Sequence, residues 1–383
     1  MKKRIVVLML AVLLVLTACG SKESKQVGKE SIVVVTDGSE SAKNALVRLS
    51  LYANEFDIKG IYNVDSSNDF KAWFDEYALA YESVADKLIE FDSAYPQSIK
   101  DLYHEDELEL LLTDANTSIL NWTNFDYADI DITEHKLLSS VKTEVKAKEV
   151  RDFSVYENVF GAKWPSQDAV YRKSLSTSWI KEKLSDVNSP LFAFYSLNKD
   201  EFIGELESLT FLSILNNGLN PLDDVTHGSW GGRLVGTEGV YNQAAEDFNE
   251  IENKMDADYS LQRFIDAFQF DFANRLKATV GEAIKLPVVS LDQKNLIEAK
   301  ANDTVIIKAS LEDEAAKAYF KWIRYEEADS YEGEIVLDGW GSSSLSFKVP
   351  EDAQAGDTIH VVLEVEEASS QLKTYQRVIV TVK

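Results

Sequence analysis

A short apolar run that ends in a polar turn constrains the fold of this chain more than any other stretch. Ile32 to Val35 are four consecutive apolar residues, and Thr36, Asp37 and Gly38 follow them directly. A run that does not alternate suits a strand covered on both faces of a parallel sheet, and glycine permits a tight turn into a helix. Ligands bind beyond the carboxyl ends of such strands. We therefore expect an α/β domain with a candidate site at Asp37.

The pattern of helices and strands continues to residue 285. Apolar residues recur at helical spacing within 45–52, 70–91, 178–184, 204–215 and 259–277, and further strands are expected at 58–64, 107–112 and 191–195. The stretch 141–150 alternates Lys and Glu and fits either an edge strand or an exposed helix. Residues 216–232 form a loop long enough to be functional. This order predicts a doubly wound, mostly parallel sheet over 31–285.

Strand patterns dominate the last part of the chain. We place the boundary near Pro287 and expect strands at 304–309, 319–325, 344–349, 358–364 and 375–382, with turn signals between them. Short strands at this spacing are typical of a β-sandwich. The sequence therefore predicts a second domain, an Ig-like β-sandwich, over 286–383.

The first 19 residues have the pattern of a bacterial lipoprotein signal. Three basic residues precede an apolar core that ends at Leu16, and Thr17 and Ala18 lead to Cys19, the only cysteine in the chain. In a signal of this kind the cysteine carries the lipid, and residues 20–30 would form a tether. The alternative is an ordinary secretory signal with a chance cysteine. We expect a lipid-anchored protein on the extracytoplasmic face of a bacterial membrane, in the cell envelope.

Charge and cysteine content exclude several classes of function. The chain has 65 acidic and 39 basic residues, for a formal net charge of −26. Such a surface repels phosphate backbones, so we do not expect nucleic acid as a partner. With Cys19 lipidated no thiol remains, which excludes disulfides, thiolate catalysis and cysteine metal sites.

Several motifs, taken in order, resemble a known family. They are Val34-Val-Thr-Asp-Gly38, Leu51 to Ile61, Asn217-Gly-Leu-Asn220, Gly228-Ser-Trp-Gly-Gly-Arg233 and Ala267-Phe-Gln-Phe-Asp-Phe-Ala273. This order is similar to the nucleoside-hydrolase-like domain of bacterial cellulose-binding proteins. The segments Phe320-Lys-Trp322, Phe347 to Pro350, Asp357 to Glu364 and Arg377 to Val380 resemble the Ig-like C-terminal domain of the same family.

The resemblance implies a calcium site that this chain keeps only in part. True nucleoside hydrolases have one Asp after the first strand and two more Asp residues four and five positions later. Asp37 matches the first, which is both ligand and presumed catalytic base, but Ser41 and Ala42 occupy the other two positions. Glu207 falls where the family tends to have an acidic residue, and Glu40 is a possible replacement ligand. Asn116 lies in a segment that resembles the family loop supplying a carbonyl and an asparagine. Calcium requires several charged oxygens, so we expect a degenerate site.

Four further residues are candidate ligand contacts, each with a structural alternative. His227 lies in the loop 216–232, which we call the glycine-rich loop. A lone histidine in a loop is usually a solvated residue. Trp230 and Gly231 could stack on a ring and allow its close approach, or Trp230 could anchor the loop against the sheet. Trp340, between Gly339 and Gly341, is a candidate for sugar stacking or could cover the end of the sandwich.

These observations predict a lipid-anchored protein that binds a carbohydrate or a nucleoside-like small molecule. One alternative is an active calcium-dependent N-ribosyl or glycosyl hydrolase that uses Asp37, Glu40 and Glu207. Another is a structural envelope lipoprotein.

Overall fold

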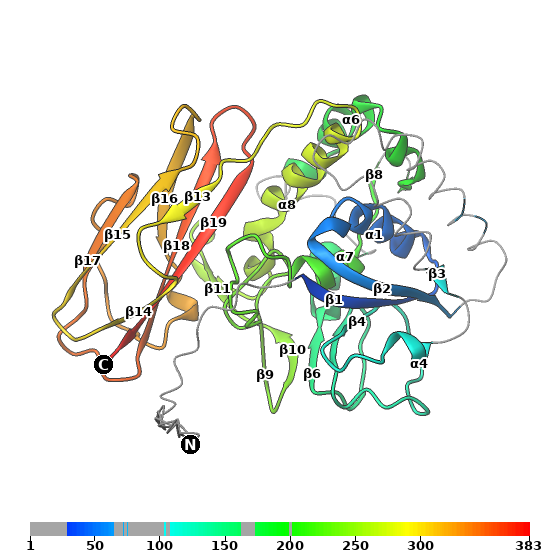
Figure 1. Cartoon of the computed structure of the whole chain (residues 1–383), viewed down its shortest axis with the longest axis horizontal. Helices are drawn as coiled ribbons and strands as arrows, with labels where there is room; N and C mark the ends of the chain where they lie inside the picture. Colours follow the sequence, from blue (N-terminus) through cyan, green and yellow to red (C-terminus); the bar gives the residue numbers. More distant parts are fainter. Residues whose placement is uncertain are drawn as a thin grey trace, which may run out of the picture.

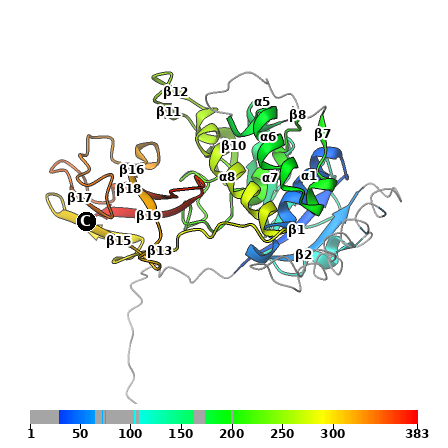
Figure 2. The same cartoon turned by 90° about the horizontal axis from the view of Figure 1, so that it is seen from above.

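The computed structural model describes residues 29–64, 72, 75, 103–104, 108–161, 173–198 and 201–383. The expected signal peptide, most of the tether and nearly all of the expected helix at 70–91 lie outside these residues. The α/β part and the strand-rich part lie side by side, with helix α8 (Tyr259–Ala278) on the side of the α/β part nearer the strands (Figures 1 and 2). In the described part of the chain, no helix has the length and apolar character needed to cross a membrane.

The α/β part is built on an eight-stranded sheet in the order β3-β2-β1-β4-β5-β6-β10-β9. All neighbours pair in parallel except the β9–β10 hairpin. The bounds are β1 Glu30–Thr36, β2 Phe56–Asn63, β3 Tyr103–His104, β4 Ser118–Asn121, β5 Lys136–Ser139, β6 Glu149–Asp152, β9 Leu234–Thr237 and β10 Val240–Ala244. The predicted mostly parallel sheet is confirmed, with β1 near its centre.

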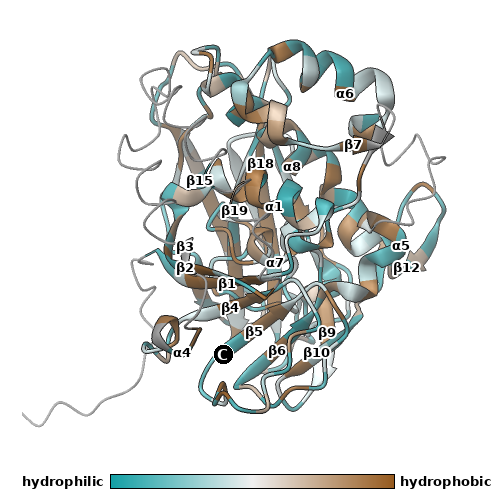
Figure 3. Cartoon of the chain, turned by 90° about the vertical axis from the view of Figure 1, so that its right-hand side faces the viewer, coloured by the Kyte–Doolittle hydropathy of each residue, from teal (hydrophilic) through white to brown (hydrophobic). Residues whose placement is uncertain are grey.

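The two faces of this sheet are covered differently. One face packs Ile32 and Val34 against α1 (Glu40–Ser50), α7 (Leu206–Leu212) and α8. The other packs Val33 and Val35 against the short helix α4 (Leu108–Leu111) and the loop that contains Tyr127 and Ile132. Ile32 to Val35 have no exposed surface, as predicted from their unbroken apolar run, and β1 and β4 are strongly hydrophobic in Figure 3.

The strand-rich part consists of two facing sheets around a core of its own. A three-stranded sheet has the order β13-β15-β17, and a four-stranded sheet has the order β14-β19-β18-β16. The bounds are β13 Val289–Leu291, β14 Leu296–Ala299, β15 Thr304–Leu311, β16 Ala318–Arg324, β17 Ser344–Lys348, β18 Thr358–Glu367 and β19 Lys373–Val382. The five predicted strands are all present, and β13 and β14 are additional short strands that the sequence pattern missed.

The two parts are joined by a buried polar contact. Asp247 accepts hydrogen bonds from Arg233 (2.8 Å), from Arg263 of α8 (2.9 Å) and from the Tyr325 hydroxyl of the sandwich (2.6 Å).

Gly218 also lies against the backbone of β19, because a Cβ built on it would be 2.0 Å from the carbonyl oxygen of Tyr375. Its positive φ of 84° adds a second reason for glycine at this position. The motif 217–220 thus packs on the sandwich.

Three predicted elements need correction. Within the expected strand at 107–112, Leu108–Leu111 is helix α4, and the next strand, β4, begins at Ser118. Residues 191–195 lie in a 3₁₀ turn, Pro190–Phe194, because the proline fixes φ at a turn value and only Leu191 and Tyr195 are buried. Residues 141–148 are irregular, and β6 begins at Glu149. The helices predicted at 178–184, 204–215 and 259–277 are confirmed as α6 (Thr177–Lys183), α7 and α8.

Candidate functional site

The turn after β1 places Asp37 at the carboxyl edge of the sheet. Gly38 adopts a positive φ of 68°, and Ser39 caps α1 by accepting a hydrogen bond from the backbone N–H of Ala42. Asp37 Oδ1 accepts from the Ser39 N–H at 3.0 Å, and Oδ2 accepts from Thr123 Oγ1 at 3.5 Å. Ser39, and not Asp37, is therefore the helix cap. Asp37 closes the turn and links it to Thr123, which follows β4.

Glu207 reaches the same edge from the first turn of α7. The indole N–H of Trp122, directly after β4, donates to Thr210 Oγ1 at 3.0 Å and so fixes α7 against the sheet. This contact positions Glu207 facing α1, where Glu207 Oε1 accepts from Ser41 Oγ at 2.9 Å. Glu207 Oε2 is buried and has no hydrogen-bond partner. The structure therefore brings Asp37, Ser41, Thr123 and Glu207 together, and we call these four residues the carboxyl-edge site.

Burial controls the protonation of this site. It raises the pKa of Glu207 to about 7, and the negative charges of Glu205 and Asp37 act in the same direction, while the hydrogen bond from Ser41 opposes them. A carboxyl group in this state can donate a hydrogen bond from Oε2 as well as accept one. The site can therefore keep the Glu207 carboxyl group neutral without a cation.

The donor set of the described residues does not fit calcium. Calcium takes six to eight oxygen ligands, with several carboxylates among them. Ala42 is fully buried and has no ligand oxygen, and one oxygen of Glu207 is occupied by the Ser41 hydroxyl. Glu40 contacts Ser196 and Lys43 instead of Glu207. Across the residues that the structure describes, no group of three or more His, Cys, Asp and Glu side chains could hold a metal ion.

Asn116 lies at the wrong edge of the sheet. It precedes β4, and Ser118 of β4 pairs in parallel with Ile32 of β1, so Asn116 is at the amino end of the strands. Its side chain contacts Asp114 and is exposed. The error follows from the helix α4 that was predicted as a strand. The residues that do follow a strand carboxyl end here are Trp122 and Thr123, which the apolar run at 119–120 followed by Asn121 could have indicated.

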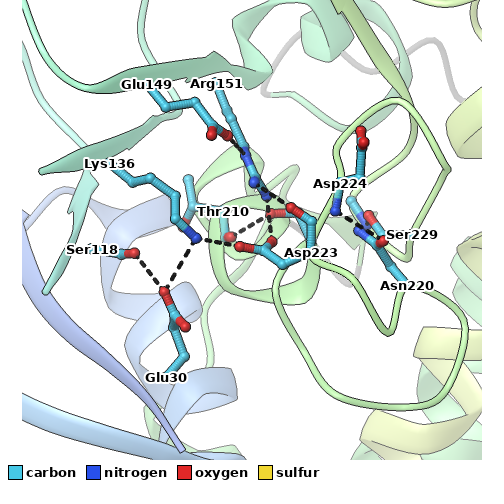
Figure 4. Close-up of polar contacts among 12 residues, drawn as sticks. Glu30, Ser118, Lys136, Glu149, Arg151, Thr210, Asn220, Asp223, Asp224 and Ser229 are labelled. Atoms are coloured by element: carbon cyan, nitrogen blue, oxygen red, sulfur yellow. Dashed lines mark hydrogen bonds and ion pairs between the residues drawn. The ribbon is translucent and has the colours of Figure 1, made fainter. Parts of the chain in front are cut away.

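The glycine-rich loop 216–232 runs along the opposite, amino-terminal edge. Lys136, at the start of β5, contacts Glu30 at 3.4 Å and forms an ion pair with Asp223, and Arg151 donates to Asp223 Oδ1 at 2.7 Å (Figure 4). These contacts hold the loop against the ends of β1, β5 and β6. The candidate residues of this loop are thus separated from Asp37 by the length of the strands.

Within this loop, His227 and Trp230 pack against the sandwich. The rings of His227 and His360 have centroids 4.5 Å apart, and Arg377 donates to the carbonyl oxygen of His227 at 2.6 Å. Burial lowers the pKa of His227 to about 4, with Asp224 opposing this shift. Trp230 is 3% exposed and lies edge-on to Tyr375, so its ring face is not open to a stacking ligand. The alternative of a loop anchor therefore describes Trp230.

Gly231 and Trp340 have opposite surroundings. A Cβ on Gly231 would be 2.6 Å from the Cβ of Ser213, so this glycine serves the close packing of the loop on the end of α7. Trp340 is 61% exposed, and its carbonyl oxygen accepts a hydrogen bond from the Trp322 N–H of β16 at 2.6 Å. Only Trp340 among the candidate aromatic residues presents its ring to solvent.

Replacing Glu207 by Gln is expected to alter how stability depends on pH. The folded protein binds a proton at Glu207 with a pKa of about 7, compared with an ordinary value of 4.5. Below pH 4.5 Glu207 is protonated in both the folded and the unfolded protein, so it does not change the stability. Between pH 4.5 and pH 7 the unfolded protein loses this proton more readily than the folded protein, which destabilises the fold increasingly. The difference in free energy of unfolding between Glu207→Gln and the parent protein should therefore shift in favour of the variant by up to about 3 kcal/mol between pH 4.5 and pH 7. Urea unfolding at several pH values measures this difference. The exposed Glu40→Gln is the control, and a pH-independent difference for Glu207→Gln would contradict the assignment.

Comparisons with known proteins agree with this architecture. Residues 110–234 match the model of the nucleoside hydrolase-like domain of the cellulose-binding protein Sde182, and residues 304–382 match the model of the C-terminal domain of cellulose-binding protein Sde0182. The first range includes Glu207 and Thr123 but not Asp37 or Ser41. None of the curated proteins compared matches the chain.

One solved structure shares the fold of nearly the whole chain. It is a nucleoside hydrolase-related protein from Saccharophagus degradans that is associated with carbohydrate metabolism, with 19% identity and a TM-score of 0.69 over 93% of this chain and 100% of that one. The titin M3 domain matches 26% of this chain at 12% identity with a TM-score of 0.19, covering 99% of its own length. Together the two domain models, which match more than half of the chain, show that it belongs to the family of cellulose-binding proteins that combine a nucleoside hydrolase-like domain with this C-terminal domain.

Proposed function

We propose that this protein binds carbohydrate and that its nucleoside hydrolase-like domain has little or no hydrolytic activity. The observation on which this rests is the contact between Ser41 and Glu207 at 2.9 Å, in place of a cluster of carboxylates around an ion. Family membership supports a carbohydrate as the ligand class, and a nucleoside-like molecule is the second candidate.

The carboxyl-edge site has the chemistry of a binding site for hydroxyl groups. Asp37 supplies an acceptor, Thr123 and Ser41 supply hydroxyls, and the buried Glu207 orients the Ser41 hydroxyl by accepting its hydrogen bond. A hydroxyl group both donates and accepts, so it can satisfy such a mixed set without a net charge. Metal-assisted hydrolysis would require a strongly activated water, and no group of His, Cys, Asp and Glu among the described residues could hold the metal ion that activates it.

The sandwich offers a separate contact for an extended sugar polymer. Trp340 projects from a turn with Gly339 at a φ of 83°, and the hydrogen bond from Trp322 holds this turn against β16. An exposed, anchored indole loses little conformational freedom when a sugar ring packs on its face. We propose Trp340 as the polymer-binding residue of this domain.

Trp340→Ala should abolish most of the binding to insoluble cellulose, because the stacking surface is lost while the fold retains its core. A pull-down of the purified protein on microcrystalline cellulose measures the bound fraction. Ile251→Ala is the matched control, since Ile251 is 62% exposed but lies in the α/β part. Equal retention of both variants would contradict the role of Trp340, and failure of the parent protein to bind any polysaccharide would favour a structural envelope protein.

A calcium-dependent hydrolase is the alternative function, supported by the retained Asp37 and by the fold. We expect no release of reducing sugar from a panel of nucleosides, with or without added calcium, and no calcium binding by calorimetry. Asp37→Asn should consequently leave this baseline unchanged. Calcium-dependent release that Asp37→Asn abolishes would overturn the proposed loss of activity.

We further propose that a lipid on Cys19 anchors the protein at the extracytoplasmic face of the bacterial membrane. The support is the sequence pattern of residues 1–19, since acyl chains contribute about 0.8 kcal/mol per buried methylene to membrane binding. Cys19→Ser should transfer the protein from the membrane fraction to the soluble fraction in a fractionation of expressing cells. Retention of the variant in the membrane fraction would contradict the anchor.

A further inference from the structure

We propose that the contact between the glycine-rich loop and the sandwich is an acid-sensitive switch, in which protonation of His227 and His360 releases the loop. We call this contact the seam. In its backbone part, the Arg377 N–H of β19 donates to the carbonyl oxygen of Gly218 at 3.0 Å. Its side-chain part consists of the Arg377 guanidinium and the two histidines, one from the loop and one from β18. The switch does not depend on which ligand the protein binds.

Arg377 links the two sides of the seam. Its Nε donates to the carbonyl oxygen of Leu219 at 2.6 Å, and its Nη2 donates to that of His227 at 2.6 Å. Its Nη1 lies 3.1 Å from Nδ1 of His360, which is 1% exposed. A guanidinium group can only donate hydrogen bonds, so Nδ1 of His360 must be the acceptor and must carry no proton. The geometry therefore requires a neutral His360.

The position of His227 also favours a neutral ring. Its ring centroid lies 4.5 Å from that of His360, with an angle of 73° between the ring planes. Among the described residues, Nδ1 of His227 is buried and has no hydrogen-bond partner, so a proton there would add a buried donor without an acceptor. Two protonated rings at this separation would also repel each other. The closed seam therefore holds both histidines neutral.

The charged groups that face the two rings come from the loop, the residue after it, β19 and the turn before β18. They are Asp224, Arg233, Arg377 and Asp329. Oδ2 of Asp224 lies 3.6 Å from Nε2 of His227, and this carboxylate is 45% exposed. Asp329 accepts from the His360 N–H at 2.5 Å and from Arg324 at 2.7 Å, so it is already paired within the sandwich. Two arginines against one half-exposed carboxylate disfavour a further positive charge on either ring.

The seam consequently loses stability when the pH falls. Burial lowers the pKa of His227 from 6.5 to about 4, with Asp224 opposing the shift and Arg377 and Arg233 adding to it. Burial, Arg377 and His227 lower the pKa of His360 to about 2. In an open seam both rings would be in water with an ordinary pKa of 6.5. A lowered pKa in the closed state means that the seam has its full stability above pH 6.5 and loses it progressively toward pH 4.

The expected effect is large within an ordinary pH range. Lowering the pH from 7 to 5 should favour the open seam about 25-fold for each histidine, since a ring with a pKa of 6.5 is mostly protonated at pH 5 and an enclosed ring is not. The two histidines together should raise the open population about 500-fold. The ion pairs of Asp223 with Lys136 and Arg151 hold the other side of the loop and contain no histidine. Acid should therefore open the seam before it detaches the loop from the sheet.

Hydrogen–deuterium exchange, measured by mass spectrometry on the purified protein, tests the switch. A peptide that contains Arg377 reports on the seam, and a peptide that contains Ile32 to Val35 reports on the core of the α/β part. After correction for the intrinsic rate at each pH, exchange in the seam peptide should rise about 500-fold from pH 7 to pH 5 and stay faster than in the core peptide. Equal rates in the two peptides would mean that acid unfolds the whole chain. Either this result or a seam rate that is independent of pH would overturn the switch.

A variant pair tests the role of the β18 histidine. His360→Asn keeps an acceptor for Arg377 but cannot take up a proton, so the rise from pH 7 to pH 5 should fall to about 25-fold, the share of His227. His135→Asn is the matched control, because His135 is also buried but lies in the α/β part, where its Nδ1 contacts the carbonyl oxygen of Thr117. The control should keep the 500-fold rise.

Equal rises in the two variants would contradict a role for His360. If His360→Asn does not fold, the parent protein decides the question through the dependence of its seam exchange on pH. The logarithm of the corrected rate should change by about two for each pH unit between pH 6 and pH 5, because two protons bind on opening. A slope of zero would overturn the switch. No sugar is present in these experiments, so their outcome is independent of the proposed carbohydrate binding.

Discussion

Burial of β1 on both of its faces is the constraint on which the rest of the α/β part depends. The four apolar residues of this strand have no exposed surface, so each face of the sheet must be covered by other elements. On one face the cover is α1, α7 and α8, and this packing positions Glu207 facing Ser41. On the other face the cover consists of a short helix and an irregular loop. Burial of this strand therefore requires the helices that cover it. Two of these helices, α1 and α7, supply Ser41 and Glu207 to the carboxyl-edge site.

The connection between the two parts depends on polar groups that are fully enclosed. Asp247 has no exposed surface and is held by two arginines and a tyrosine from three different segments. Removing both arginines would leave the buried carboxylate uncompensated, which is much more costly than losing a surface ion pair.

The carboxyl-edge site keeps only part of the residue pattern that the resemblance to nucleoside hydrolases implies. The structure brings Asp37 and Glu207 to the same edge of the sheet, where burial raises the pKa of Glu207 and favours a partly protonated carboxyl group. A site of this kind suits hydrogen bonding with a neutral ligand better than coordination of a cation. Family membership points to the same ligand chemistry, which is that of hydroxyl-rich molecules.

Local pattern was enough to predict β1, β2, the turn at Asp37, four helices and the five longer strands of the sandwich, because each depends on its own periodicity. It was also enough to show that Ala42 could not be a metal ligand. It failed at 107–112 and 191–195, where short apolar runs do not distinguish a strand from a helix or turn. The edge at which Asn116 lies, the burial of Trp230 and the pairing of Ser41 with Glu207 depend on contacts between residues far apart in the chain. Only the tertiary structure decided these, because burial and partner choice are set by packing across elements and not by neighbours in sequence.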